Sequence, residues 1–221
     1  MDILYEKFSN LLNNEDKEAC VSLIISQFNN ASSPEDIVSI YTKVLAKALN
    51  DIGCNLKDKN ICIWKEHIRS SIVRTILENA YPFIIKLKNN FNSYNGKTVA
   101  VICPDGEYHE IGARMISDFF TLAGFNSIYV GASTPKEEFI NALDYNKIDI
   151  FALSITNYFN LVSAKKIISA IKEKEKGKVM IAVGGQAFNN NPSAVLSIGA
   201  DILLHTYEDI LSLEIEKKEI N

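Results

Sequence analysis

The spacing of apolar residues changes near residue 90, and no other feature of the chain constrains its fold as much. Before this point, apolar residues recur three and four positions apart, which is the period of helices that bury one face. Beyond it, short β-branched runs alternate with helical stretches, a pattern typical of parallel strands joined by crossover helices. The sequence therefore predicts a helical bundle over residues 1–88 and an α/β domain over residues 97–221.

The first part of the chain predicts a bundle of four or five helices. The helical pattern runs through "DILYEKFSNLL", "EACVSLIISQF", "EDIVSIYTKVLAKAL" and "EHIRSSIVRTILENAYPFIIKL". Ser33 stands just before the third stretch, where a serine oxygen can accept a free amide of the first helical turn. The Asn-rich segment "KNNFNSYNGK" has no apolar stripe, so we expect it to link the bundle to the second domain.

The second part predicts a doubly wound, flavodoxin-like parallel sheet of five strands with helices on both faces. The expected strands are "TVAVIC", "SIYVG", "DIFALSI", "KVMIAVGG" and "ADILLH", and helical stretches lie between them. Ligands of such sheets bind at the carboxyl ends of the strands. The loops that follow the strands are therefore where we expect a site.

Composition excludes several classes of protein. A formal net charge of −4 is the opposite of the basic face that nucleic-acid binding needs, so no direct nucleic-acid contact is expected. No apolar run approaches the ~20 residues that cross a bilayer. The four cysteines form no CxxC pair, and the chain starts without a basic and then apolar signal segment. We therefore expect a reduced, cytoplasmic protein.

The loop after the first strand, "CPDGEYHEIG", does not fit the common nucleotide sites. It lacks the GxGxxG of dinucleotide-binding loops and the GxxxxGK[ST] of phosphate cradles. A phospho-accepting receiver domain would need an aspartate after the third strand, where Ser154 and Thr156 stand. The loop instead offers His109, one of three histidines, in a place suited to a metal ligand or a general base. The alternative for a single histidine at a strand–helix junction is a cap or a surface residue.

Three segments, 107–112, 154–156 and 184–185, together resemble the signature of cobalamin-binding domains. That signature is Asp-x-His-x-x-Gly after the first strand, Ser-x-Leu or Ser-x-Thr after the third, and Gly-Gly after the fourth. Its order and spacing match over roughly residues 97–218, which the resemblance makes a Rossmann-like cobalamin-binding domain. The helical part is similar to the cap domain that accompanies this module in methyl-carrying corrinoid proteins and in cobalamin photoreceptors.

The resemblance implies a cobalamin whose nucleotide base is detached, with His109 as the lower axial ligand of cobalt. A histidine on a short loop can take this position because the corrin fills four equatorial positions and leaves two axial ones. Glu107 replaces the family's aspartate and is one methylene longer; it would accept a bond from the other ring nitrogen of His109 and fix its tautomer. Gly112 would let the backbone approach the corrin edge without a Cβ clash.

The other two segments would hold the nucleotide tail of the cofactor. Ser154 and Thr156 are expected to face the same way, because side chains alternate along a strand, and to bond the detached base or line its slot. Gly184 and Gly185 would leave room for the tail between sheet and helix. The alternatives are that both hydroxyls satisfy backbone groups at a strand end, and that Gly-Gly is an ordinary turn.

The cap residues implied by the resemblance are Glu66, His67 and Trp64. In the photoreceptors a Trp-His pair stands nine residues before Glu-His and shields the upper face of the cofactor. Here the corresponding residues are Leu56 and Lys57, so the tryptophan lid is missing unless Trp64 takes its place. The alternatives are a core role for Trp64 and an ordinary helical pair for Glu66 and His67.

The resemblance implies two functions, neither with a substrate site of its own. Because the Glu-x-His loop resembles the sensor branch, the first is a cobalamin-dependent sensor or signalling adaptor. It would hold adenosylcobalamin, respond to light or chemistry, and act through a partner protein or a change of homo-oligomer. The alternative is a methyl carrier that holds methylcobalamin and serves methyltransferases. A third option is a relic that binds another metal through Asp105, Glu107 and His109.

Overall fold

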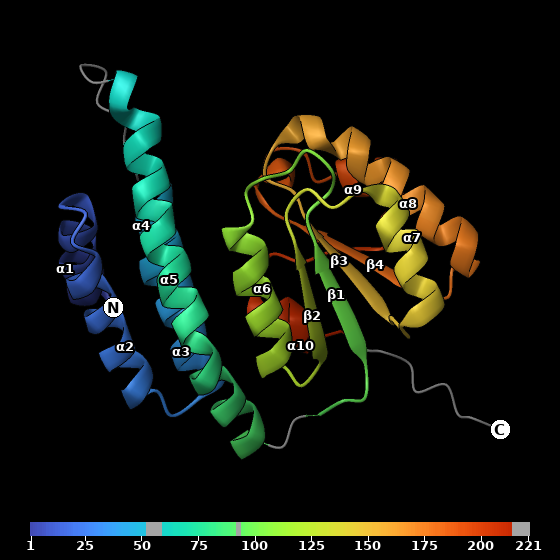
Figure 1. Ribbon diagram of the computed structural model, residues 1–221. Helices are drawn as coiled ribbons and strands as arrows, with labels where there is room; N and C mark the ends of the chain where they lie inside the picture. Colours follow the sequence, from blue (N-terminus) through green and yellow to red (C-terminus); the bar gives the residue numbers. More distant parts are fainter. Residues whose placement is uncertain (52–58, 92–93, 214–221) are drawn as a thin grey trace. The chain divides into compact units, whose positions relative to one another are not determined.

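The computed structural model describes residues 1–51, 59–91 and 94–213 (Figure 1). The chain forms two compact units, one made of Met1–Asn95 with Glu110–Phe125, and the other of Gly96–His109 with Asn126–Asn221. The predicted fold class is confirmed, since a helical part precedes a five-stranded parallel sheet. The domain limits 1–88 and 97–221 stay a prediction.

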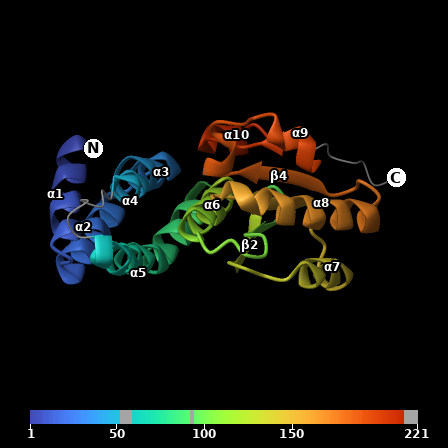
Figure 2. The same ribbon diagram turned by 90° about the horizontal axis from the view of Figure 1, so that it is seen from above.

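The helical unit begins with three helices whose limits follow the apolar pattern of the sequence. Its elements are α1 (Asp2–Asn13), α2 (Lys17–Asn30), α3 (Pro34–Ile40), the π-helical turn η1 (Tyr41–Ala46), α4 (Lys47–Asn50), α5 (Lys59–Phe91) and α6 (Ile111–Leu122). Figures 1 and 2 show α1, α2 and α5 side by side. Ser33 caps α3 as predicted, because its side chain accepts the Asp36 amide while the Asp36 carboxylate accepts the Ser33 amide.

Aromatic side chains form much of the core of the helical unit. Phe28 of α2 packs edge-on against Tyr41 with ring centroids 6.0 Å apart, and Tyr41 lies 5.8 Å from the ring of Phe119 on α6. Full burial of such side chains contributes roughly 1.5–3 kcal/mol each. Helix α6 therefore packs within the helical unit, although its sequence lies between two strands of the sheet.

The second unit is a parallel sheet in the order β2-β1-β3-β4-β5. Its strands are β1 (Thr98–Ile102), β2 (Asn126–Gly131), β3 (Ile150–Ser154), β4 (Met180–Gly184) and β5 (Ile202–Leu203). Its helices are α7 (Lys136–Tyr145), η3 (Tyr158–Asn160), α8 (Leu161–Glu175), η4 (Gln186–Phe188), α9 (Ala194–Ile198) and α10 (Tyr207–Leu211). Parallel strands need a crossover connection that returns the chain to the starting edge of the sheet, and helices form these connections here.

One face of this sheet carries large apolar side chains. Phe151 and Leu153 of β3 join Ile181 and Val183 of β4 in a buried core that includes residues of α7, α8 and α9. Figures 1 and 2 show α8 lying along the sheet. Because strand residues alternate between faces, the intervening residues of β3 and β4 belong to the opposite face.

That opposite face carries small residues at the carboxyl ends of the two strands. Ala152 pairs with Ala182, and Ser154 pairs with Gly184. None of these side chains is larger than a hydroxymethyl group. The two neighbouring strands therefore carry only small side chains on this face near the loops that follow them, and Ala152 and Ala182 are buried there.

The glycines at the end of β4 let backbone segments approach each other closely. Gly185 has a φ of +108°, and a Cβ placed on it would lie 2.3 Å from the carbonyl oxygen of Ile155. A Cβ on Gly184 would lie 2.8 Å from the carbonyl oxygen of Leu204. Both glycines are therefore required by the packing of the sheet's carboxyl edge.

The cysteines differ in part from the expectation of a fully reduced chain. Cys20 and Cys103 are buried free thiols. Cys62, in contrast, takes part in a disulfide. Among the described helices, none is both long and apolar enough to cross a membrane.

Replacing Gly185 with Ala is expected to lower the free energy of unfolding by roughly 3 kcal/mol, because the new Cβ collides with backbone and the left-handed φ disfavours it. Gly177 is the matched control, since its φ is +75° but nothing lies within 4 Å of an added Cβ. Gly177→Ala should lower the free energy of unfolding by about 1 kcal/mol, because it adds only the cost of a left-handed φ for alanine. Urea denaturation of both variants measures the difference, and equal losses would contradict the close approach.

Candidate cobalamin site

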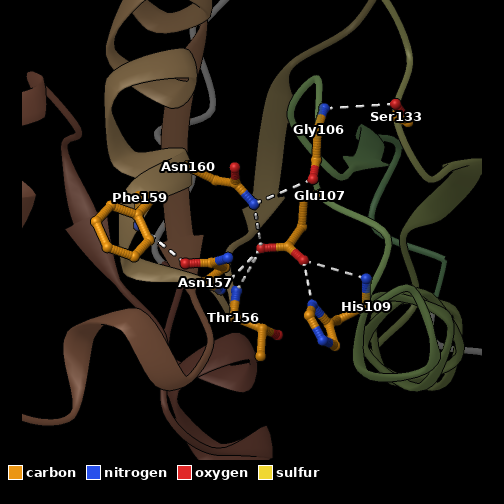
Figure 3. Close-up of polar contacts among 8 residues, drawn as sticks. All are labelled: Gly106, Glu107, His109, Ser133, Thr156, Asn157, Phe159 and Asn160. Carbon is orange, nitrogen blue, oxygen red and sulfur yellow. Dashed lines mark hydrogen bonds and ion pairs between the residues drawn. The ribbon is translucent and has the colours of Figure 1, made fainter. Parts of the chain in front are cut away.

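The candidate site lies at the carboxyl ends of β1 and β3, which are neighbours in the sheet. From β1 the chain continues to β2 on one side, and from β3 it continues to β4 on the other. This is the switch point at which open α/β sheets bind their ligands. The loops that follow β1 and β3 bring together most of the residues drawn in Figure 3, and Ser133 comes from the loop after β2.

The buried carboxylate of Glu107 joins these two loops (Figure 3). Its Oε2 accepts the backbone N–H groups of Thr156 (3.0 Å) and Asn157 (2.9 Å) and the side-chain amide of Asn160 (3.0 Å). Its Oε1 accepts the backbone N–H of His109 (3.1 Å) and lies 2.5 Å from Nδ1 of that ring. Burial by itself raises the pKa of Glu107, but hydrogen bonds from Asn157, Asn160 and His109 together lower it to about 2. Glu107 is therefore a fixed anion.

The imidazole of His109 is held at one nitrogen and open at the other. Because an ionised carboxylate can only accept, Nδ1–H of the neutral ring donates to Glu107 and Nε2 keeps its lone pair. The His109 side chain is 59% exposed. Within the described part of the chain, Nε2 has no hydrogen-bond partner. A carboxylate behind one nitrogen and a free second nitrogen is the usual arrangement of a metal-ligating histidine.

The loop that carries His109 is also fixed on the side of β2. The backbone N–H of Ser133 donates to the carbonyl oxygen of Glu107 (3.2 Å), and Ser133 Oγ accepts the amide of Gly106 (3.4 Å). Ser133 Oγ also donates to Asp105 (3.5 Å). Asp105 thus takes part in shaping the loop. Among the residues that the structure describes, no group of three or more His, Cys, Asp or Glu side chains is placed to hold a metal ion, so the relic hypothesis has no ligand set there.

Two residues of the site, Asn157 and Asn160, were not predicted from the sequence. The amide of Asn160 donates both to Glu107 and to the carbonyl oxygen of Gly106 (3.4 Å). The side chain of Asn157 accepts the amide of Phe159 and caps η3. Asparagines just before a helix predict caps, and that signal was present. No local pattern in the sequence indicated that the Glu107 carboxylate would accept hydrogen bonds from these two residues.

The residues predicted to hold the nucleotide tail lie beside this network. Ser154 ends β3, and Thr156 gives its backbone N–H to Glu107. Both side chains are half-buried, and neither hydroxyl has a hydrogen-bond partner among the described residues. Gly184 pairs with Ser154 across the strands, and Gly185 follows it. Contact of these four residues with a nucleotide stays a prediction.

The remaining predicted site residues belong to the helical unit: Gly112, Trp64, Glu66 and His67. Gly112 is the second residue of α6, and the other three lie on α5. Trp64 is 67% exposed and lines, with His67, a hollow of about 510 Å³ on the helical unit. Leu56 and Lys57 lie outside the described residues.

Comparison with known proteins identifies the family to which the sheet domain belongs. The family model of the B12 binding domain matches residues 97–213. The chain belongs to the B12-binding domain family. It is a cobalamin-binding corrinoid protein, as the resemblance predicted.

Three relatives span most of the chain. A corrinoid protein of Desulfitobacterium hafniense is 24% identical over 86% of this chain and 88% of its own length. The transcriptional repressor CarA of Myxococcus xanthus is 21% identical over 78% of this chain and 56% of its own length. The structure of the monomethylamine corrinoid protein of Methanosarcina barkeri is similar with a TM-score of 0.77, covering 95% of this chain and 96% of that one at 15% identity. The last similarity shows that the fold is shared.

Replacing Glu107 with Gln is expected to lower the free energy of unfolding by about 3 kcal/mol, because an amide presents one donor group to a site built from N–H donors. Glu107→Asp should lower the free energy of unfolding by less, because aspartate keeps the negative charge although its side chain is one methylene shorter. Glu138→Gln, on the exposed face of α7, is the control and should be within about 0.5 kcal/mol of the native chain. Urea denaturation without cofactor is the measurement. An unchanged free energy of unfolding in Glu107→Gln would contradict the hydrogen-bond network around Glu107.

Proposed function

We propose that the protein holds cobalamin with its nucleotide base detached and with His109 as the lower axial ligand of cobalt. The observation that carries this proposal is the bond between His109 Nδ1 and the buried Glu107 carboxylate, which leaves Nε2 free. Bound cobalamin would supply a cobalt atom that carries an alkyl group on its upper side. The chain itself orients the imidazole, fixes its tautomer and keeps the second nitrogen unprotonated for the metal.

The end of β3 supports detachment of the base. A nucleotide base that leaves the metal needs new polar partners, and the side chains of Ser154 and Thr156 are half-buried there. Neither hydroxyl has a hydrogen-bond partner among the described residues. Each could therefore bond to a nitrogen or oxygen atom of the detached base.

For the biological role, we propose a corrinoid carrier that presents a methyl group to a methyltransferase partner. Its support is that relatives named as corrinoid proteins correspond to this chain over nearly their whole length, with both the helical part and the sheet. A cobalamin-dependent sensor is the second candidate. It is favoured by the repressor among the relatives and by glutamate, rather than aspartate, at position 107.

Replacing His109 with Ala tests the lower ligand. After reconstitution with methylcobalamin in the dark, we expect the native chain to show the absorption spectrum of a histidine-bound corrinoid. We expect His109→Ala to lose that spectrum and to retain cobalamin at least about tenfold more weakly in gel filtration. His205→Ala is the control, because His205 bonds to Asp209 only through its backbone N–H and should leave the spectrum unchanged. An unchanged spectrum in His109→Ala would refute the assignment.

The carrier and the sensor differ in the alkyl group that they should prefer on cobalt and in their expected response to light. A carrier should retain methylcobalamin at least as well as adenosylcobalamin and keep its elution volume after green illumination. A sensor should prefer adenosylcobalamin and change both its spectrum and its elution volume on illumination. Equilibrium dialysis with each form, followed by size-exclusion chromatography in the dark and after light, distinguishes them. A light-dependent change of assembly would overturn the carrier proposal while leaving the His109 assignment in place.

A further inference from the structure

The chain after β2 continues to pair with the chain after β1 beyond the ends of both strands. The amide of Cys103 donates to the carbonyl oxygen of Gly131 (3.2 Å), and the amide of Ser133 donates to the carbonyl oxygen of Glu107 (3.2 Å). The second bond reaches the residue whose carboxylate orients His109. A residue outside the loops after β1 and β3 therefore restrains the backbone at Glu107.

Two irregularities of the backbone bring Ser133 to this place. The register of β1 against β2 shifts between Val101 and Ile102, and the pairing skips Val130. Such a bulge bends a strand, and bulges are frequent next to functional sites. Ser133 itself has a φ of +50°, in the left-handed region that residues with a Cβ rarely adopt. Its contacts with the loop after β1 therefore hold Ser133 in a conformation that serine does not favour.

The turn that Ser133 holds comes directly before the Glu107 side chain. The amide of Glu107 donates to the carbonyl oxygen of Pro104 (2.9 Å) and closes this turn, in which Gly106 has a φ of +83°. Ser133 Oγ accepts the amide of Gly106 (3.4 Å; Figure 3) and donates to the carboxylate of Asp105 (3.5 Å). Together with the backbone bond, Ser133 thus contacts three successive residues of one turn.

The place of the Glu107 backbone decides which atoms its carboxylate reaches. Oε2 is bonded to the backbone amides of Thr156 and Asn157, which belong to the loop after β3. Oε1 is bonded to the ring of His109, whose side chain is exposed. If the turn shifted, the exposed ring would be the partner with the most freedom to move. The bond to His109 would therefore change before the bonds to the buried amides.

We propose that Ser133 is a positioning residue for His109, acting through the turn 104–107 and the Glu107 carboxylate. It holds the turn where Glu107 accepts the Nδ1 proton of His109, so that Nε2 keeps its lone pair. Ser133 needs no contact with a cofactor for this role. The orientation of the ring is a property of the cofactor-free chain, and its use in binding cobalt rests on the proposed function.

Ser133→Gly separates positioning from stability. Glycine removes the hydroxyl but adopts a left-handed φ readily, and the groups that it releases on the exposed residues Asp105 and Gly106 can bond to water. The free energy of unfolding should therefore not fall below that of the native chain. Lys176→Gly is the matched control, because Lys176 also has a φ of +50° but stands at the end of α8.

Nitrogen-15 NMR of the cofactor-free chain measures the His109 tautomer, because a protonated ring nitrogen and one with a lone pair differ in chemical shift. With the ring neutral, native His109 should be mainly in the Nδ1–H form. The share of the Nε2–H form should rise about threefold or more in Ser133→Gly, since residues of one hydrogen-bond network are coupled, and stay native in Lys176→Gly. Equal populations in the native chain and Ser133→Gly would overturn the proposal, as would a tautomer change that appears only with a loss of stability.

Equilibrium dialysis with cobinamide, a corrinoid that lacks the nucleotide, tests the consequence for cobalt without competition from the cofactor's own base. The Kd should be about tenfold higher in Ser133→Gly than in the native chain and unchanged in Lys176→Gly. His109→Ala serves as the reference for a lost axial ligand. Equal Kd values in the native chain and His109→Ala would refute the proposed function, and the tautomer measurement would still decide the role of Ser133. A weakened His109→Ala beside an unchanged Ser133→Gly would refute the positioning role alone.

Discussion

The buried carboxylate of Glu107 is the interaction on which the candidate site depends. Burying a charge is costly unless its hydrogen-bonding capacity is filled, and here N–H groups from two loops fill it. The same bonds hold the loop after β1 to the loop after β3, and the His109 ring is oriented as a consequence. The local fold and the readiness of His109 for a metal therefore have one cause.

Much of the fold follows from the sequence because its signals are local. The switch from a period near 3.6 to short β-branched runs predicts both units, and Ser33 predicts the start of α3. The sequence predicts the end of α5 less well. The helix continues to Phe91, although the Asn-rich segment "KNNF" has no apolar stripe that would predict a helix. Helix ends depend on weak local preferences, which an apolar pattern does not show.

What the sequence did not predict depends on long-range contacts. Glu107 was expected to meet His109, two residues away, but its bonds to Asn157 and Asn160 cross 50 and 53 positions. The grouping of α6 with the helical unit includes the bond between Tyr41 and Asp118, which are 77 positions apart. Polar pairs of this kind leave no periodic trace, whereas apolar faces do.

One cobalamin-binding fold can serve both a carrier and a sensor, because a fold does not determine function by itself. The two roles make different demands on the helical unit. A carrier needs a cap that gives way to a partner enzyme, and a sensor needs one that responds to the upper group. Trp64 and His67 of α5 are exposed and line one hollow of the helical unit.

Electron paramagnetic resonance of the cobalt(II) form tests the central claim most directly, because the unpaired electron couples to the axial nitrogen. The protein is prepared with nitrogen-15 histidine and reconstituted with unlabelled cobalamin. If His109 is the ligand, the nitrogen splitting changes from a triplet to a doublet on labelling, and it is absent in His109→Ala. A triplet that persists in the labelled protein would mean that the cofactor's own base remains on cobalt, and it would contradict the account.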